Sequence, residues 1–228
     1  MEENTFKEIC TFELFQGLNN YSYQMMKENG RIAEFDTNYI LIKEKHDANE
    51  LYFILDGVVS IYKINANGQK KVFYMLNKGC FINEDLDHRS SSINAELHVQ
   101  SKLFILQKDI VFEMMKNDFI FTQKILSSLS SKVRRLYRQL KNTPNSIRVE
   151  KKVAAKLYKL CKDYGIKKNN EIEIDLQLSI TFLADLLGSQ RETVSRAVKK
   201  LQETGLIYYK NRKFYVKDIE ALAYYFKS

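Results

Sequence analysis

The amino-acid sequence predicts an α+β fold: an N-terminal antiparallel β-roll of the jelly-roll or cupin-like type, then a long helix, then a C-terminal winged helix-turn-helix. Three observations predict it. Short apolar runs separated by turn residues extend from Glu34 to about Gln107. Residues 108–143 show helical periodicity without glycine or proline, and the residues around Gly188 have helix-turn-helix spacing. The expected domains are residues 1–108, 109–143 and 144–228.

The roll is expected from apolar runs and the turns between them. Leu51–Leu55 and Val58–Tyr62 flank Asp56-Gly57, a dipeptide favoured in tight hairpins because it tolerates positive φ. A second turn is expected at Asn65–Gly68. No helix separates these runs, so an antiparallel sandwich or barrel is predicted. The other strands are expected at Val72–Leu76, Ile93–Val99 and Leu103–Leu106, after a helical segment at Phe6–Gly30.

A long helix is expected from Asp109 to about Asn142, which at 1.5 Å per residue would extend about 50 Å. Its leucines and valine have the alternating spacing of three and four residues that is typical of a heptad seam. The seam residues are Leu126, Leu129, Val133, Leu136 and Leu140. Polar neighbours make this stripe narrow, which favours a parallel pair with a second copy of the chain; a helix packed only on its own domain is the alternative. Pro144 ends the helix and forms the hinge.

The region after Pro144 has the elements of a winged domain. Ser146–Tyr164 is helical and strongly basic, and Glu171–Asp175 alternates as a short strand. Leu206–Tyr209 and Lys213–Val216, around Lys210-Asn211-Arg212, predict a two-stranded wing.

Positive charge is concentrated in this last region. Of the formal net charge of +8, residues 1–144 contribute +1 (19 Lys and Arg minus 18 Asp and Glu) and residues 145–228 contribute +7 (17 minus 10). This asymmetry predicts a polyanionic partner for the C-terminal region. A solvated basic face without a partner would have the same charge, so charge alone leaves both interpretations open.

Composition excludes several other classes of protein. With 228 residues, 45% of them hydrophobic, the chain suffices for one large domain or two modest ones and is not of a disordered type. We expect no membrane span, and the acidic N-terminus lacks the order of a signal peptide. The cysteines (Cys10, Cys80 and Cys161) are dispersed, which disfavours a disulfide framework and a zinc site and indicates a cytoplasmic protein.

The segment from Ser179 to Leu201 meets the steric requirements of a helix-turn-helix. The two helices approach most closely at a small residue, Ala184, and the tight turn needs a residue that tolerates positive φ, Gly188. Ser189 and Glu192, three positions apart, predict a capping box at the start of the second helix. Leu183, Leu187 and Val194 are expected to fill the space between the helices.

The second helix presents polar side chains suited to DNA. Arginine binds guanine bidentately in the major groove, and glutamate accepts from cytosine. Lysine outnumbers arginine 27 to 9, so two arginines in this helix favour base recognition; a surface Glu192–Arg196 ion pair is the alternative. The predicted base-reading residues are Arg191, Glu192, Ser195 and Arg196. The candidates for phosphate contacts are Ser179, Thr181, Ser189, Gln190, Thr193, Lys199, Lys151, Lys152 and Lys156.

These segments resemble the CRP/FNR family of bacterial transcription regulators over nearly the whole chain. Gly188–Arg196 resembles the family's recognition-helix motif, Leu14–Leu18 the entry to its sensor domain, and Leu51–Val59 its most typical hairpin. The resemblance implies a cytoplasmic homodimer that binds a near-palindromic operator on double-stranded DNA and contacts RNA polymerase. The roll would be the sensor, controlled by a small effector.

The same resemblance implies how bases are read. By position, Arg191, Glu192 and Arg196 match the CRP-type triplet, while Glu192, Ser195 and Arg196 match the FNR-type one. This implies a TGA-like core in each half-site, read by Glu192 and Arg196.

The effector is not identified by the sequence. The cyclic-nucleotide branch uses a Gly-Glu pair and a later Arg-Ser pair to hold phosphate; here Asn83 replaces the glycine before Glu84, and Arg89-Ser90 follows about five residues too early. We therefore expect no cyclic nucleotide. A lone Cys10 does not supply an FNR-type iron–sulfur cluster, and no spacing requires haem on Cys80 with His46, His88 or His98. The effector-pocket candidates are Cys80, Asn83, Glu84, Arg89 and Ser90.

Two other functions are alternatives to that of a sensor-regulator. A cupin-like metalloenzyme needs several histidine and carboxylate ligands, and the three histidines form no His-x-His, so we expect neither a catalytic residue nor a metal site. A DNA-binding regulator without an effector, whose roll is only a dimerisation or protein-contact scaffold, is the second alternative. The sequence does not distinguish activator from repressor, nor does it name target genes.

Overall fold

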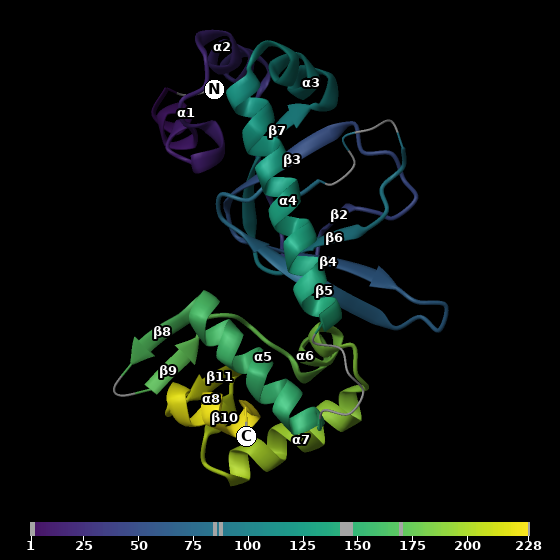
Figure 1. The fold of residues 1–228 in the computed structure, drawn as a ribbon, viewed down its shortest axis with the longest axis vertical. Helices are drawn as coiled ribbons and strands as arrows, with labels where there is room; N and C mark the ends of the chain where they lie inside the picture. The colour runs from purple at the N-terminus through teal and green to yellow at the C-terminus, as the bar shows by residue number, and fades with distance from the viewer. Residues whose placement is uncertain (1–2, 84–85, 87–88, 142–147, 169–170, 228) are drawn as a thin grey trace. The chain divides into compact units, whose positions relative to one another are not determined.

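The structure is a computed structural model that describes residues 3–83, 86, 89–141, 148–168 and 171–227; of residues 139–141 it describes only the backbone. The chain divides into two compact units (Figure 1). The first comprises Met1–Lys63 and Phe73–Asn142, and the second comprises Ile64–Val72 and Thr143–Ser228.

The first unit contains the predicted β-roll, which is built from two sheets. One sheet has the strand order β1-β7-β3 and the other the order β2-β6-β4-β5. The pairs β1–β7, β3–β7, β2–β6 and β4–β6 are antiparallel. The strands are β1 (Arg31–Phe35), β2 (Ile40–Ile42), β3 (Glu50–Asp56), β4 (Val58–Ile64), β5 (Lys70–Asn77), β6 (Asn94–Leu97) and β7 (Ser101–Gln107). The predicted roll is therefore confirmed, with β1 and β2 added to the predicted runs.

Asp56-Gly57 does not form the predicted hairpin. β3 pairs with β7 and β4 pairs with β6, so the chain passes from one sheet to the other at Gly57. Gly57 has a φ of +112°, and a Cβ atom there would collide with the Ser101 side chain. The dipeptide permits a sharp turn, but the long-range partners decide the pairing. The turn at Asn65–Gly68 forms as predicted: Gly68 N donates to Asn65 O (2.9 Å), between the neighbouring strands β4 and β5.

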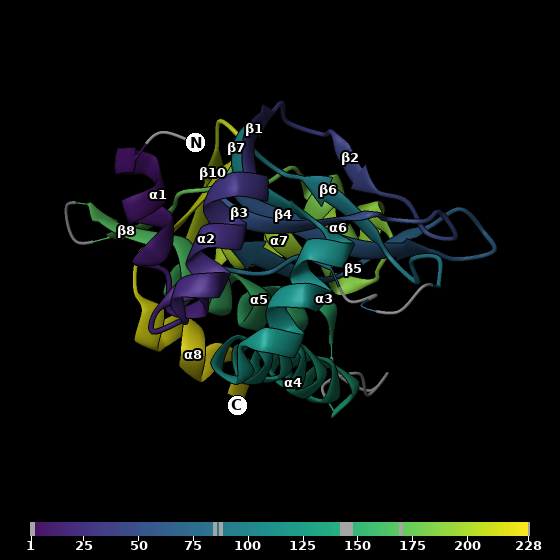
Figure 2. The same ribbon diagram turned by 90° about the horizontal axis from the view of Figure 1, so that it is seen from above.

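The predicted N-terminal helix consists of three short pieces. They are α1 (Glu3–Cys10), a 3₁₀ turn η1 (Glu13–Phe15) and α2 (Asn20–Asn29). Together with α3 (Lys108–Asn117) and the start of α4 (Phe119–Lys141) they gather at one end of the roll (Figures 1 and 2). There they share an apolar cluster with Phe53 of β3 and Phe104 of β7.

The prediction of one uninterrupted helix from Asp109 is wrong. Helix α3 (Lys108–Asn117) ends before Asp118, whose backbone is extended (φ −135°, ψ 99°), and helix α4 (Phe119–Lys141) begins after it. The Asp118 carboxylate accepts from Phe121 N (3.2 Å), which caps α4, and from Asn19 N (2.8 Å). Burial raises the pKa of Asp118, but these hydrogen bonds to the carboxylate outweigh burial and leave the pKa lowered.

The described residues of the predicted seam lie on two different faces of helix α4. Leu129 and Leu136 are half-buried against the apolar clusters of the roll. Leu126 is 53% exposed and Val133 is 45% exposed. The Leu140 side chain lies outside the described residues. The exposed face also carries Phe119 and Tyr137, so the outward apolar stripe is shifted by part of a turn from the predicted seam, and pairing through it stays a prediction.

The second unit is a helical domain with one four-stranded sheet of order β10-β11-β9-β8. Its helices are α5 (Val149–Tyr164), α6 (Ile180–Leu187), α7 (Arg191–Glu203) and α8 (Ile219–Lys227). Its strands are β8 (Gly165–Lys168), β9 (Glu171–Ile174), β10 (Ile207–Lys210) and β11 (Lys213–Val216). The predicted wing is confirmed as β10–β11, and it is extended into a sheet by β9 and β8.

Candidate nucleic-acid interface

The turn between α6 and α7 has the geometry that the sequence predicts. Gly188 adopts the left-handed conformation (φ 61°, ψ 39°), and Ser189 N donates to Ala184 O (3.1 Å). This is a glycine C-cap in which the residue after the glycine satisfies a carbonyl of the preceding helix. The glycine is required here because a side chain is strained at this φ.

The predicted capping box is wrong. Helix α7 begins at Arg191, one residue later than expected, and its N-cap residue Gln190 makes no side-chain capping hydrogen bond. The reason lies in the turn: Ser189 belongs to the C-cap of α6, which displaces it from the N-cap position of α7. Ser179 is the residue that caps, since its hydroxyl accepts from Phe182 N (3.0 Å) at the start of α6.

Apolar side chains fix the two helices against each other. Leu183 and Ala184 of α6 and Val194 of α7 are buried as predicted, while Leu187 is half-buried. Ala197 and Leu201 continue the buried face of α7. One side of α7 is therefore used for packing, and its opposite side is left for a partner.

That opposite side carries all four predicted base-reading residues. Arg191, Glu192, Ser195 and Arg196 are exposed on α7. Arg196 Nε donates to the backbone carbonyl of Glu192 (3.4 Å), a long bond within the helix. Among the ion pairs of the described residues, none joins the side chains of Glu192 and Arg196. The alternative of a surface ion pair is thus not what the structure contains.

The phosphate-contact candidates divide into exposed and half-buried residues. Thr181, Gln190 and Lys199 are exposed. Ser179, Ser189, Thr193, Lys151, Lys152 and Lys156 are half-buried. Burial lowers the pKa of Lys156 to about 8, with the neighbouring Lys159 adding to the shift, and the amine is still mostly protonated at neutral pH.

A groove between the N-terminal end of α5 and helix α7 adds residues that the sequence analysis did not single out. Arg148 and Lys200 line it beside the predicted residues Thr193, Arg196 and Lys199. Lys200 Nζ lies 2.8 Å from the Glu150 carboxylate, which lowers the pKa of Glu150. Basic residues of two helices thus meet along one groove, and Arg148 could have been found from its place at the start of a basic helix.

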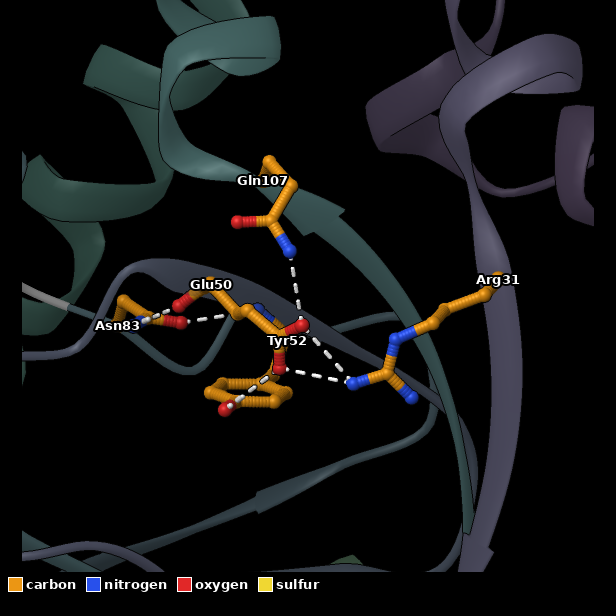
Figure 3. A network of polar contacts seen from close by, with 5 residues as sticks. All are labelled: Arg31, Glu50, Tyr52, Asn83 and Gln107. Atoms are coloured by element: carbon orange, nitrogen blue, oxygen red, sulfur yellow. Dashed lines mark hydrogen bonds and ion pairs between the residues drawn. The ribbon is translucent and has the colours of Figure 1, made fainter.

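In the roll, the side chain of Asn83 is hydrogen-bonded to the backbone of strand β3 (Figure 3). Tyr52 N donates to Asn83 Oδ1 (2.9 Å), and Asn83 Nδ2 donates to the Glu50 carbonyl (3.0 Å). The Glu50 carboxylate accepts from Arg31 (2.9 Å), Gln107 (3.0 Å) and the Tyr52 hydroxyl (3.2 Å). Burial, and then the Glu50 carboxylate, raise the pKa of Tyr52 to about 12. The residue at the expected glycine position therefore extends the pairing of β3.

Helix α4 also binds the backbone at Ile82 and Asn83. The buried Lys132 donates to the carbonyls of Ile82 (2.9 Å) and Asn83 (2.7 Å), and its ammonium lies 4.9 Å from the centre of the Phe81 ring. Arg135 donates to Met75 O (2.8 Å) at the end of β5. In the sequence Lys132 is one of the polar neighbours of the predicted seam, and nothing there indicates this long-range role.

The described effector-pocket candidates differ in burial, and their role in a pocket stays a prediction. Cys80 is half-buried, Asn83 is fully buried, and Arg89 and Ser90 are exposed. Glu84 and His88 lie outside the described residues. His46 Nδ1 contacts the Glu44 carbonyl (3.1 Å). The described residues hold no group of three metal-binding side chains. Nor, within those same ranges, is any helix long and apolar enough for a membrane span.

Comparison with known proteins agrees with this architecture. A model of the cyclic nucleotide-binding domain matches residues 32–118, and a model of the Crp-like helix-turn-helix domain matches residues 151–225.

Individual relatives match over most of both chains. The CRP-like cAMP-activated global transcriptional regulator of Mycobacterium tuberculosis is 21% identical over 214 residues, covering 92% of this chain and 94% of that protein. The anaerobic regulatory protein of Bacillus subtilis is 20% identical, covering 81% and 79%. FixK2 from Bradyrhizobium japonicum superposes with a TM-score of 0.72 at 18% identity, covering 86% of this chain and 96% of that one. A regulator from Eubacterium rectale gives 0.76 at 18% identity, covering 95% and 99%. The chain belongs to the CRP/FNR family of transcription regulators.

Proposed function

We propose that this regulator binds near-palindromic DNA as a homodimer, with helix α7 of each subunit in the major groove. The observation that carries the proposal is the exposed face of α7, where Arg191, Glu192, Ser195 and Arg196 project from a helix whose other face is buried. A recognition helix reads base edges with the residues of its N-terminal part. Arg196 donates to a guanine in a TGA-like half-site, and Glu192 accepts from a cytosine on the opposite strand.

Phosphate contacts position α7 in the groove. Thr181, Gln190 and Lys199 are exposed around the helix-turn-helix, and the groove beside α7 adds Arg148 and Lys200. Lys151 and Lys152 of α5, whose side chains are half-buried, contact phosphates of the same DNA strand. Such contacts give affinity without sequence preference.

The second copy of the chain binds through helix α4. Leu126 and Val133, seven residues apart, are both exposed, and Phe119 lies a further seven residues before Leu126. Residues at this interval stay on one side of paired helices. Two copies of α4 side by side would cover this stripe and place two α7 helices at half-sites of one operator.

The roll acts on this dimer as a sensor for a small effector. The side chain of Asn83 and the carbonyls of Ile82 and Asn83 are bonded to the chain's own groups. These internal hydrogen bonds support a ligand other than a cyclic nucleotide. An effector must favour one arrangement of the dimer over another, since equal affinity shifts nothing. The protein is cytoplasmic, contacts RNA polymerase and has no catalytic activity.

Selection from randomised double-stranded DNA tests the proposal. The expected result is an enriched sequence with two inverted half-sites, each containing a TGA-like core, with centres about 10 base pairs apart. Enrichment of a single unpaired half-site would contradict the homodimer, and no enrichment would contradict base reading. Melting curves with metabolites, cyclic nucleotides and haem then test the sensor: an effector raises the melting temperature and changes affinity for the selected DNA.

A further inference from the structure

The tip of the wing has an unusual residue for its backbone conformation. Two residues, Asn211 and Arg212, connect the paired Lys210 and Lys213 of β10 and β11. Their φ angles are +52° and +58°, and positive φ at both central positions is the pattern of a type I′ hairpin turn. Asparagine is well suited to the first position, but glycine is strongly preferred at the second. An arginine in this conformation is strained, and strain of this kind gathers at functional positions.

The Arg212 side chain is not used for folding. It is exposed, and within the described ranges neither Arg212 nor Lys210 forms an ion pair. The next residue shows the contrast: Lys213 Nζ lies 2.6 Å from Glu173 and 2.7 Å from Asp175. Lys168 also binds Glu173 (2.6 Å). The carboxylates of Glu173 and Asp175 are thus bonded to Lys213 and Lys168, while Arg212 points to solvent with its charge available.

The backbone of Arg212 is bonded to the start of the helix-turn-helix. Leu178 N donates to the Arg212 carbonyl (2.7 Å), and the Tyr209 hydroxyl donates to the Leu178 carbonyl (2.9 Å). The buried Leu178 immediately precedes Ser179, which caps α6. In a helix-turn-helix the first helix crosses the DNA backbone beside the major groove that the second helix reads. Arg212 is therefore held beside the N-terminal end of α6, the helix that by this geometry would cross the DNA backbone.

We propose that Arg212 enters the minor groove that flanks the major groove read by α7, and so selects A·T-rich flanks outside the core half-site. This inference rests on the proposed DNA binding by α7. A narrow A·T-rich minor groove has an enhanced negative potential that attracts arginine. Arginine suits this role better than lysine because its guanidinium is more weakly hydrated. The chain has only 9 arginines against 27 lysines, yet one lies at this tip in place of the preferred glycine.

Binding to DNA with fixed cores and varied flanks tests the inference. Three duplexes differ only in flanks of A·T, G·C or inosine·C pairs. Inosine·C presents a minor groove like that of A·T but a major groove like that of G·C, so it separates the two grooves. We expect the wild-type protein to bind the A·T and inosine·C flanks about tenfold more tightly than the G·C flank.

Two glycine variants provide the comparison. Arg212→Gly removes the side chain and fits the left-handed conformation, so the protein should fold at least as stably. We expect its flank preference to fall below about twofold. Asn211→Gly makes the same backbone change and keeps Arg212, so the preference should stay about tenfold.

The outcomes that would overturn the inference are distinct. If Arg212→Gly weakens all three flanks equally and reduces the salt slope by about one, Arg212 touches only phosphate. If inosine·C flanks bind like G·C flanks, the preference is read in the major groove. If the wild-type protein prefers no core sequence at all, the proposed function fails, and this inference fails with it before any variant is compared.

Discussion

Replacing Lys132 with methionine is expected to loosen helix α4 from the roll. Methionine keeps most of the aliphatic packing of the buried lysine but removes its ammonium. The carbonyls of Ile82 and Asn83 then lose donors at 2.9 and 2.7 Å, and the Phe81 ring loses its cation at 4.9 Å. A hydrogen bond to a charged group contributes about 1.5–3 kcal/mol, and the cation–ring contact about 0.5–2 kcal/mol.

These contributions do not add fully, because burial of the ammonium itself costs free energy that methionine avoids. We therefore expect a loss of about 2–4 kcal/mol in the local free energy of opening. The reporter is the amide of Ile82, which donates to Tyr52 O (2.9 Å). A loss of that size should speed its hydrogen exchange by a factor of about 30–700.

Lys124→Met is the matched control on the same helix. Lys124 also donates to a carbonyl, that of Glu13, but at a solvent-exposed contact. Water replaces an exposed donor, so the control should cost less than about 1 kcal/mol and leave exchange at Ile82 unchanged. Less than a threefold change at Ile82 in the Lys132→Met protein would show that the two carbonyls do not depend on the ammonium.

Two further predictions concern the dimer and the wing. Replacing Leu126 and Val133 together with lysine should convert the proposed dimer to a monomer in sedimentation. The far-ultraviolet circular dichroism should stay unchanged, because both side chains are exposed in one subunit; a persistent dimer would place the interface elsewhere. Hydrogen bonds from Lys168 and Lys213 lower the pKa of Glu173 below its usual 4.5. The resulting stabilisation is complete above pH 4.5 and is lost as the pH falls through the lowered pKa, so the melting-temperature advantage of wild type over Glu173→Gln should shrink from pH 5 to pH 3. An advantage that stays constant over this range would show that the ion pairs contribute nothing.

Local signals predicted the helix-turn-helix almost completely. Ala184 and Gly188 are required by short-range sterics, and both occupy the predicted places. The capping box failed because Ser189 satisfies two sequence patterns at once, the end of one helix and the start of the next. Only the hydrogen bond from Ser189 N to Ala184 O decides between them.

Long-range contacts explain the remaining errors. Asp56-Gly57 has the right chemistry for a hairpin, yet β3 finds its partner in β7, about 50 residues later in the chain. The break at Asp118 had a local signal, since aspartate is a favoured N-cap residue. The Asp118 carboxylate also accepts from the distant Asn19 N, which the local sequence does not indicate. Nothing near Asn83 or Lys132 in the sequence indicates that each binds a distant backbone segment. The positive φ of Arg212 could not be predicted from the sequence, because it depends on the type of turn that joins β10 and β11.

Binding of an Arg196→Ala protein to specific and random DNA tests most directly whether Arg196 reads a base. We expect a loss of about 1–3 kcal/mol on the selected operator, a relaxed preference at one base pair, and nearly unchanged affinity for random DNA. Arg196→Lys should restore little, because an ammonium cannot donate bidentately to guanine. Equal weakening on specific and random DNA would mean that Arg196 contacts only phosphate and reads no base.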